Sequence, residues 1–176
     1  MRSPGSEQGG SKGLAPAGAR PQSADMIRIA LDSPVGQLCV TEEDGAITGL
    51  DWGGASEGVE SPLLAEARTQ LAAYFDGTRR AFDLPLAPAG SAFQRAVCDA
   101  MCAIPFGETR TYGDLATVLG ASAQAIGHAC GANPIPVLIA CHRVLGATSL
   151  GGYSGAGGIE TKVALLRHEG AAGLLI

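Results

Sequence analysis

Two closely spaced prolines constrain this chain more than any other feature of its sequence. The run Asn133-Pro134-Ile135-Pro136 cannot be helical, because each proline disfavours the helical conformation of the residue before it. The apolar residues Val137–Ala140 follow, and we expect them to form an extended segment. This segment ends at Cys141-His142-Arg143. The sequence therefore predicts an apolar, non-helical stretch that presents a thiol, an imidazole and a guanidinium in succession.

The N-terminal half has the alternation of a small antiparallel sheet. Apolar residues alternate with polar ones from residue 27 to residue 40, with a break at Ser33-Pro34. Asp44-Gly45 is a hairpin signal that precedes a third apolar run, Ala46–Trp52. Three antiparallel strands are therefore predicted.

A helix is predicted after the strands, and a linker after the helix. Ser61-Pro62 has the order of a helix cap and first turn, and apolar residues keep helical spacing as far as Asp76-Gly77. Residues 78–90 contain Pro85 and Pro88, which indicates a crossing linker with room for one short strand.

The second half is predicted to be mainly helical. Ser91 can cap a helix that stops before Pro105, and Thr111 can cap a short helix that ends at Gly120. Ser122 can cap a further helix as far as Gly131, and this order of short helices is that of a helix-turn-helix unit. After a glycine-dense loop over residues 150–158, a last helix is expected over Ile159–Glu169.

These elements divide the 176 residues into three parts and give an α+β fold class. Residues 1–24 are rich in Gly, Pro and Ser and have no apolar core of a signal peptide, so we expect a disordered tail. We expect an N-terminal α/β domain over residues 25–88 and a mainly helical domain over residues 89–176.

Charge and cysteine content exclude several classes of protein. Residues 91–176 carry five basic and five acidic residues, so there is no basic footprint and counterion release can add only modestly to binding of nucleic acid. No run of apolar residues is long enough to span a bilayer. Five cysteines without a signal sequence indicate reduced thiols and a cytoplasmic protein. Cys98 and Cys102 lie four residues apart, which is not the spacing of a zinc knuckle, and no metal site is expected.

Several motifs together resemble one protein family. The run NPIPVLIACHRV over residues 133–144, YGDLA over residues 112–116, GYSG over residues 152–155, Lys162 and HEG over residues 168–170 are similar to the methylated-DNA-protein-cysteine methyltransferases, or O6-alkylguanine-DNA alkyltransferases. The resemblance covers roughly residues 26–172. It implies a ribonuclease H-like N-terminal domain and a C-terminal DNA-binding and alkyl-acceptor domain with a winged-helix-like helix-turn-helix.

The resemblance also implies the reaction and the catalytic residues. Family members transfer an alkyl group from O6 of guanine to a cysteine, here Cys141, in a single irreversible turnover. A thiol must be deprotonated to attack, and the family pattern assigns His142 as the base, acting through a water molecule and oriented by Glu169. Tyr112 matches a tyrosine that stabilises the flipped nucleotide. Asn133 matches an asparagine that ties the helix-turn-helix to the segment that carries the cysteine.

Other matched positions are expected to contact the base or the DNA. Tyr153 and Ser154 match the loop over the alkyl pocket, Lys162 matches a lysine near that pocket, and Arg143 is expected to brace the loop. Gln124 and Gly127 lie on the predicted recognition helix. Gln124 stands where the family has an arginine that fills the space left by the flipped base, so we expect weaker duplex binding or slower repair than in a relative with arginine there. Ala140 is a second departure, because the family usually has proline directly before the cysteine.

The implied partner is alkylated double-stranded DNA, bound in the minor groove with a flipped guanine by a monomer, with no cofactor. Two other functions remain open at this point. The first is a lesion sensor that binds without transfer, although such relatives lack the cysteine. The second is a cysteine hydrolase that uses Cys141, His142 and Glu169 over many turnovers.

Overall fold

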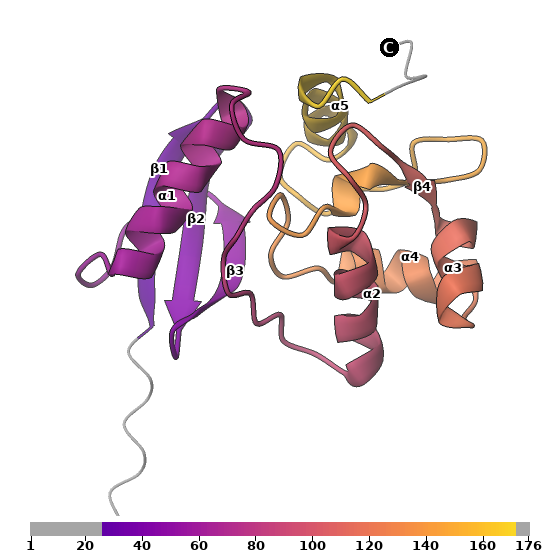
Figure 1. Ribbon diagram of the computed structural model, residues 1–176, viewed down its shortest axis with the longest axis horizontal. Coiled ribbons are helices and arrows are strands. Elements are labelled where there is room, and N and C mark those ends of the chain that lie inside the picture. Colours follow the sequence, from indigo (N-terminus) through magenta and orange to yellow (C-terminus); the bar gives the residue numbers. More distant parts are fainter. Residues whose placement is uncertain (1–25, 172–176) are drawn as a thin grey trace, which may run out of the picture.

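The computed structural model describes residues 26–171, and the tail expected over residues 1–24 lies outside this range. The first three strands form one antiparallel sheet in the order β1 (Ile27–Ser33), β2 (Gly36–Glu43) and β3 (Ala46–Trp52), as the alternation predicted. The sheet lies to one side of a mainly helical region (Figure 1). The α+β fold class is confirmed.

The apolar face of this sheet is covered by the helix α1 (Pro62–Phe75) (Figure 1). Ser61 caps α1, since its hydroxyl accepts a hydrogen bond from the backbone N–H of Leu64 at 3.0 Å. The strands contribute every second residue to this core and α1 contributes residues at helical spacing. The fully buried members of the layer include Leu38, Val40, Ile47, Leu64, Ala67 and Leu71.

The outer edge of β3 is paired with two segments from elsewhere in the chain. Ile47 exchanges backbone hydrogen bonds with the linker, donating to Pro85 and accepting from Ala87, both at 2.8 Å. Three residues further along β3, the N–H of Leu50 donates to the carbonyl of Pro134 at 3.0 Å. The linker therefore forms only an isolated β-bridge at Leu86, and not the short strand for which the sequence left room. Because Pro134 begins the segment that carries Cys141, this edge joins the sheet to the reactive part of the molecule.

The helical region contains the predicted helix-turn-helix. The helices are α2 (Ala92–Cys102), α3 (Tyr112–Leu119) and α4 (Ala123–Gly131), and the side chains of Ser91, Thr111 and Ser122 cap them as expected. Gly120 ends α3 with φ of 62°, a left-handed conformation that glycine adopts without strain. Two short strands, β4 (Arg110–Thr111) and β5 (Val144–Leu145), pair in parallel beside these helices.

The segment before Cys141 is not extended, and that expectation was wrong. The N–H of Ile139 donates to the carbonyl of Ile135, and Val137 has a φ of 73°, so the chain folds back in a tight turn. Cys141–Arg143 then forms a 3₁₀ turn, η1. The prolines do exclude helix before Pro136, but they do not force the following apolar residues into a strand. Compaction into a turn buries all of residues 137–140.

The last helix, α5 (Ile159–His168), ends one residue earlier than expected, with Glu169 as its C-terminal cap. Among residues 26–171, no helix is both long and apolar enough to cross a membrane.

Candidate active site

A cavity of about 420 Å³ lies between the helix-turn-helix and the glycine loop. It brings together residues from α3, α4, η1 and the loop over residues 150–158. The residues lining it are Tyr112, Gly127, Cys130, Gly131, Cys141, Gly152, Tyr153 and Ser154. Five of the residues predicted to act on the substrate therefore face one hollow: Tyr112, Gly127, Cys141, Tyr153 and Ser154.

Cys141 is almost completely buried at this cavity, with 5% of its surface exposed. Burial raises the pKa of the Cys141 thiol, while the Asn133 side chain and the positive charge of Lys162 act to lower it. A thiol whose charged form is disfavoured needs a base close by before it can attack. His142, the next residue in the chain, is the candidate for this base.

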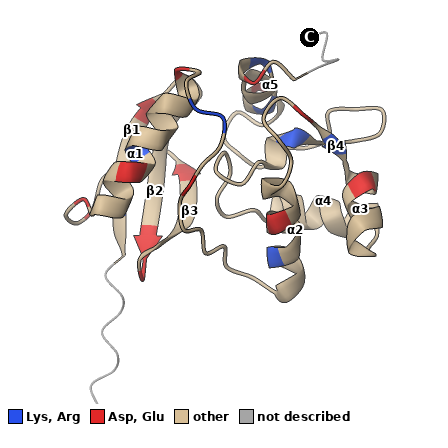
Figure 2. Ribbon diagram, in the orientation of Figure 1, with Lys and Arg blue, Asp and Glu red and all other residues tan. Residues whose placement is uncertain are grey.

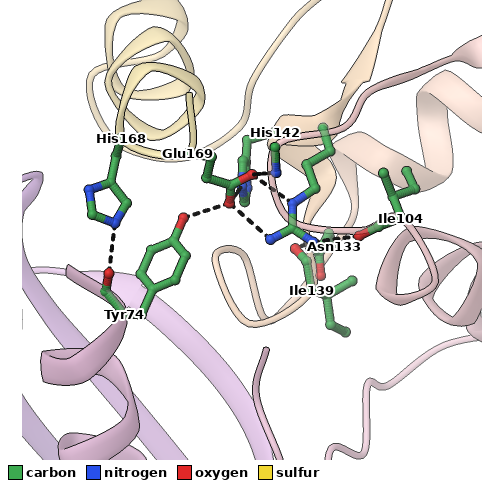
Figure 3. A network of polar contacts seen from close by, with 9 residues as sticks. Tyr74, Ile104, Asn133, Ile139, His142, His168 and Glu169 are labelled. Carbon is green, nitrogen blue, oxygen red and sulfur yellow. Dashed lines mark hydrogen bonds and ion pairs between the residues drawn. The ribbon is translucent and has the colours of Figure 1, made fainter. Parts of the chain in front are cut away.

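Glu169 holds a group of buried polar side chains that includes His142, the residue next to Cys141 in the sequence (Figure 3). Its Oε1 accepts hydrogen bonds from the Tyr74 hydroxyl at 2.7 Å and from Arg143 Nη2 at 2.9 Å, and lies 2.7 Å from His142 Nε2. Its Oε2 accepts from Arg143 Nε at 2.9 Å. Burial acts to raise the pKa of Glu169, but the hydrogen bonds from His142 and Arg143 outweigh it, and the pKa lies well below its usual range.

This ionised carboxylate fixes the tautomer of His142. A carboxylate is only an acceptor, so the neutral imidazole carries its proton on Nε2 and leaves Nδ1 with a free lone pair. Burial lowers the pKa of His142, against the effect of Glu169. The Nδ1 atom is buried and has no hydrogen-bond partner among the described residues. It is therefore available to accept a proton, directly or through a water molecule.

Asn133 satisfies backbone groups in the turn that carries the cysteine. Its Nδ2 donates to the carbonyl of Ile139 at 3.0 Å, and its Oδ1 accepts from the N–H of Ile135 at 3.0 Å. One side chain therefore holds both ends of the tight turn around Val137. Losing it would leave the buried N–H of Ile135 unpaired, whereas the carbonyl of Ile139 would keep the hydrogen bond that it accepts from the N–H of Cys141.

Lys162 and Arg143 do not line the cavity. Lys162 is fully buried, and its Nζ donates to the carbonyls of Val144 at 2.6 Å and Gly152 at 3.1 Å, so it ties the glycine loop to β5. Burial lowers the pKa of Lys162 to about 8. Arg143 points toward Glu169, and its Nη1 donates to the carbonyl of Ile104 at 2.5 Å. The structure thus places Arg143 in the buried ion pair with Glu169 instead of against the cavity.

Gln124 is exposed on α4 and is not part of the cavity wall. It lies three and seven residues before Gly127 and Gly131, which puts it on the helix face that borders the cavity. That face carries no formal charge, because Ala123–Gly131 contains no Lys, Arg, Asp or Glu (Figure 2). The expected lack of a basic footprint is therefore seen at the helix nearest the cavity mouth.

Three residues near the site were not singled out from the sequence. Tyr74 was assigned only to the apolar face of α1, although a tyrosine hydroxyl on a buried face needs a partner and could have pointed to one. Trp52 was assigned only to a strand end, and it packs against Tyr153 with ring centroids 6.1 Å apart. Cys130 is a second thiol in the cavity wall, and burial raises its pKa to about 12. Within residues 26–171, no three His, Cys, Asp or Glu side chains are grouped to hold a metal ion.

Known proteins match both halves of the chain. The family model described as "6-O-methylguanine DNA methyltransferase, ribonuclease-like domain" matches residues 26–88, and "6-O-methylguanine DNA methyltransferase, DNA binding domain" matches residues 92–171. The constitutive methylated-DNA–protein-cysteine methyltransferase of Bacillus subtilis is 41% identical over 152 residues, which cover 78% of this chain and 92% of that protein. A protein of the same name from Mycolicibacterium paratuberculosis is 42% identical over 149 residues, covering 79% of this chain and 89% of that one.

Solved structures give the same result. The crystal structure of the Mycobacterium tuberculosis O6-methylguanine methyltransferase superimposes with a TM-score of 0.73 at 37% identity, covering 86% of this chain and 96% of that one. The Mycobacterium tuberculosis protein in complex with DNA gives a TM-score of 0.72 at 39% identity, covering 81% of this chain and 92% of that one. With matches along almost all of the described residues, the chain belongs to the methylated-DNA–protein-cysteine methyltransferase family.

Proposed function

We propose that this protein repairs DNA by direct reversal, transferring an alkyl group from O6 of guanine to Sγ of Cys141. The observation that carries the proposal is a buried thiol in a cavity wall, next in the sequence to His142, whose imidazole pairs with Glu169. The product is a thioether, which water does not cleave under ordinary conditions. Each molecule therefore acts once.

The reaction begins with deprotonation of Cys141. Its proton passes to Nδ1 of His142 through one water molecule, and Glu169 stabilises the imidazolium that forms. The thiolate then attacks the alkyl carbon in line with the C–O6 bond. A carbon–sulfur bond forms, the C–O6 bond breaks, and its electron pair stays on guanine.

Guanine leaves with a negative charge unless a donor is close. We assign this role to the hydroxyl of Tyr112, a residue that lines the cavity. Burial raises the pKa of Tyr112, so the hydroxyl stays protonated and can donate to the ring as charge develops. The proton held by His142 finally neutralises the departing base, so that thiol and alkylated guanine become thioether and guanine.

The partner is alkylated double-stranded DNA, bound by α4 in the minor groove with the damaged nucleotide turned into the cavity. Tyr153, Ser154 and Gly127 form the walls against the base. Gln124 lies on the same face and fills the space that the nucleotide leaves. Lys162 holds the loop, Asn133 holds the turn before Cys141, and Arg143 braces Glu169.

We further propose that the protein acts as a monomer in the cytoplasm. One chain supplies the nucleophile, the base and the cavity walls, so a second copy has no catalytic part to contribute. The five cysteines are all free thiols, which suits a reducing compartment.

Mass spectrometry after incubation with a duplex containing one O6-methylguanine tests the proposal. We expect each protein molecule to gain one methyl group at most, mapped by peptide analysis to Cys141 and not to Cys130. Cys141→Ser is the matched control and should stay unmodified. A retained but unmodified complex would instead indicate a sensor, and release of product over many turnovers would indicate a hydrolase.

A further inference from the structure

Trp52, at the end of β3, contacts the glycine loop that forms one wall of the cavity. Its ring lies edge-on to Tyr153, with centroids 6.1 Å apart and planes at 85°. The backbone of Gly155 runs directly over the indole, so that a Cβ added there would lie 2.7 Å from Cη2 of Trp52 and closer still to Cε1 of Tyr153. The N-terminal sheet and the cavity wall thus meet at one aromatic side chain.

The indole is fixed on its own side of this contact. Its Nε1 donates a hydrogen bond to the carbonyl of Val35, in the turn between β1 and β2, at 3.0 Å. A Cβ added at Gly36 would lie 3.5 Å from Cδ1 of Trp52, which is ordinary van der Waals distance. Because the indole is held by this hydrogen bond and by packing at its edge, it can keep the glycine loop that contacts it in place.

The loop has separate anchors at its two ends. Lys162 Nζ bonds the carbonyl of Gly152, and the Thr161 hydroxyl bonds the carbonyl of Ala156 at 2.5 Å. Between them, the hydroxyl of Tyr153 is buried and has no partner among residues 26–171. The Tyr153 ring is therefore positioned by packing, and Trp52 is its aromatic neighbour.

Space for the loop to move lies next to this contact. A second cavity of about 240 Å³ is lined by Trp52, Asn133, Pro134 and Gly155 among others. It shares two lining residues, Gly131 and Ser154, with the cavity that contains Cys141. A loop released from Trp52 could shift into this space and join the two hollows.

We propose that Trp52 is a positioning residue of the N-terminal domain that sets the place of Tyr153 and Ser154 and so limits the size of the alkyl group that reacts well. The proposal rests on the alkyl transfer proposed above. It assigns the N-terminal sheet a part in substrate selection through one side chain, without contact to the reacting atoms.

Single-turnover rates with duplexes that carry O6-methylguanine or O6-benzylguanine test this. In Trp52→Ala we expect methyl transfer at saturating duplex to slow by about tenfold, because a wall displaced by an ångström no longer holds a small adduct in line. Benzyl transfer should slow less, so that the ratio of benzyl to methyl rates rises. Trp52→Phe keeps an aromatic ring and should restore most of the wild-type ratio.

Ile29→Ala is the matched control, since it removes a buried side chain from the same sheet away from the loop. It should lower stability without changing the ratio of rates. A wild-type ratio in Trp52→Ala, or the same altered ratio in Ile29→Ala, would overturn the proposal. Absence of transfer by the wild-type protein would instead count against the proposed function.

Fluorescence provides a measurement that does not depend on a folded alanine variant or on transfer. Trp52 is the one tryptophan of the sequence, so its emission reports on this contact alone. In Cys141→Ser, an O6-methylguanine duplex should change the emission, whereas the same duplex with guanine should leave it unchanged, because only a base held in the cavity presses on the loop. Equal emission with both duplexes, when both are bound, would contradict the proposal.

Discussion

The hydroxyl of Tyr74 donates a hydrogen bond of 2.7 Å to Oε1 of Glu169, the atom that also lies 2.7 Å from Nε2 of His142. Tyr74 belongs to α1, and Glu169 ends α5. The N-terminal domain therefore contributes one of the donors to the carboxylate that orients the base. His168, next to Glu169, reinforces the junction through its Nε2, which lies 2.7 Å from the carbonyl of Tyr74.

Tyr74→Phe should lower the free energy of unfolding by about 1.5–3 kcal/mol, because it removes a buried hydrogen bond to a charged group. It should also slow alkyl transfer by a smaller factor than loss of His142, since Arg143 still holds Glu169 in place. Urea unfolding and single-turnover kinetics measure the two effects. Unchanged stability would mean that the hydroxyl contributes nothing to the network.

Glu169 should make stability depend on pH in acid. Its pKa is lowered in the folded protein, so its contribution is present above the unfolded value of about 4.3 and is lost as the pH falls from there toward the folded pKa. Glu169→Gln should therefore be less stable than the wild type at pH 7, by about 3–5 kcal/mol for an ion pair broken on one side. The difference should shrink between pH 5 and pH 3, as measured by urea unfolding. A constant difference across that range would contradict the lowered pKa.

Gln124→Arg should tighten binding to duplex DNA. An arginine adds a positive charge and stacking area on the face of α4 that otherwise carries no formal charge. If the guanidinium contacts a phosphate, the slope of log affinity against log salt should steepen by about 0.9. Fluorescence anisotropy at several salt concentrations measures both effects, with Gln124→Ala as the control that adds no charge. Unchanged affinity in the arginine variant would show that position 124 does not face the DNA.

Ala140→Pro should stabilise the protein by about 0.4–1 kcal/mol, because the ring restricts the unfolded chain at a position where its φ is already suitable. Ala140 has φ of −78° and ψ of 58°, and the N–H of Cys141 donates to the carbonyl of Ile139 across it at 2.8 Å. These values are those of an inverse γ-turn and lie within the range that proline permits. Thermal unfolding measures the change, and a fall in the midpoint would indicate a clash of the ring with Ile139.

Local signals predicted most of the secondary structure. Each helix cap assigned from Ser61, Ser91, Thr111 and Ser122 is present, because a capping side chain and the helix it caps are close in sequence. The three strands follow for the same reason, since alternation and the Asp44-Gly45 turn act over a few residues. The motifs also contained five of the residues that line the cavity, namely Tyr112, Cys141, Gly152, Tyr153 and Ser154.

The errors and omissions depend on tertiary contacts. Val137 adopts a positive φ that a β-branched residue resists, and it does so because Asn133 and the buried surroundings fix both ends of the turn. Neither condition is visible in the apolar run itself. The partners of Glu169 and Tyr153 that were missed, Tyr74 and Trp52, lie about a hundred residues away in the sequence, and no local pattern links them.

The absence of charge on α4 has a consequence for how such a protein searches a genome. Attraction to phosphates accounts for most of the time that a protein spends on intact DNA, and this helix offers little of it. Visits to undamaged sequence should therefore be brief, and prolonged residence should require a lesion that enters the hollow beside Cys141. Each protein molecule reacts only once. Brief binding to undamaged DNA therefore leaves more unreacted molecules free to find the next alkylated base.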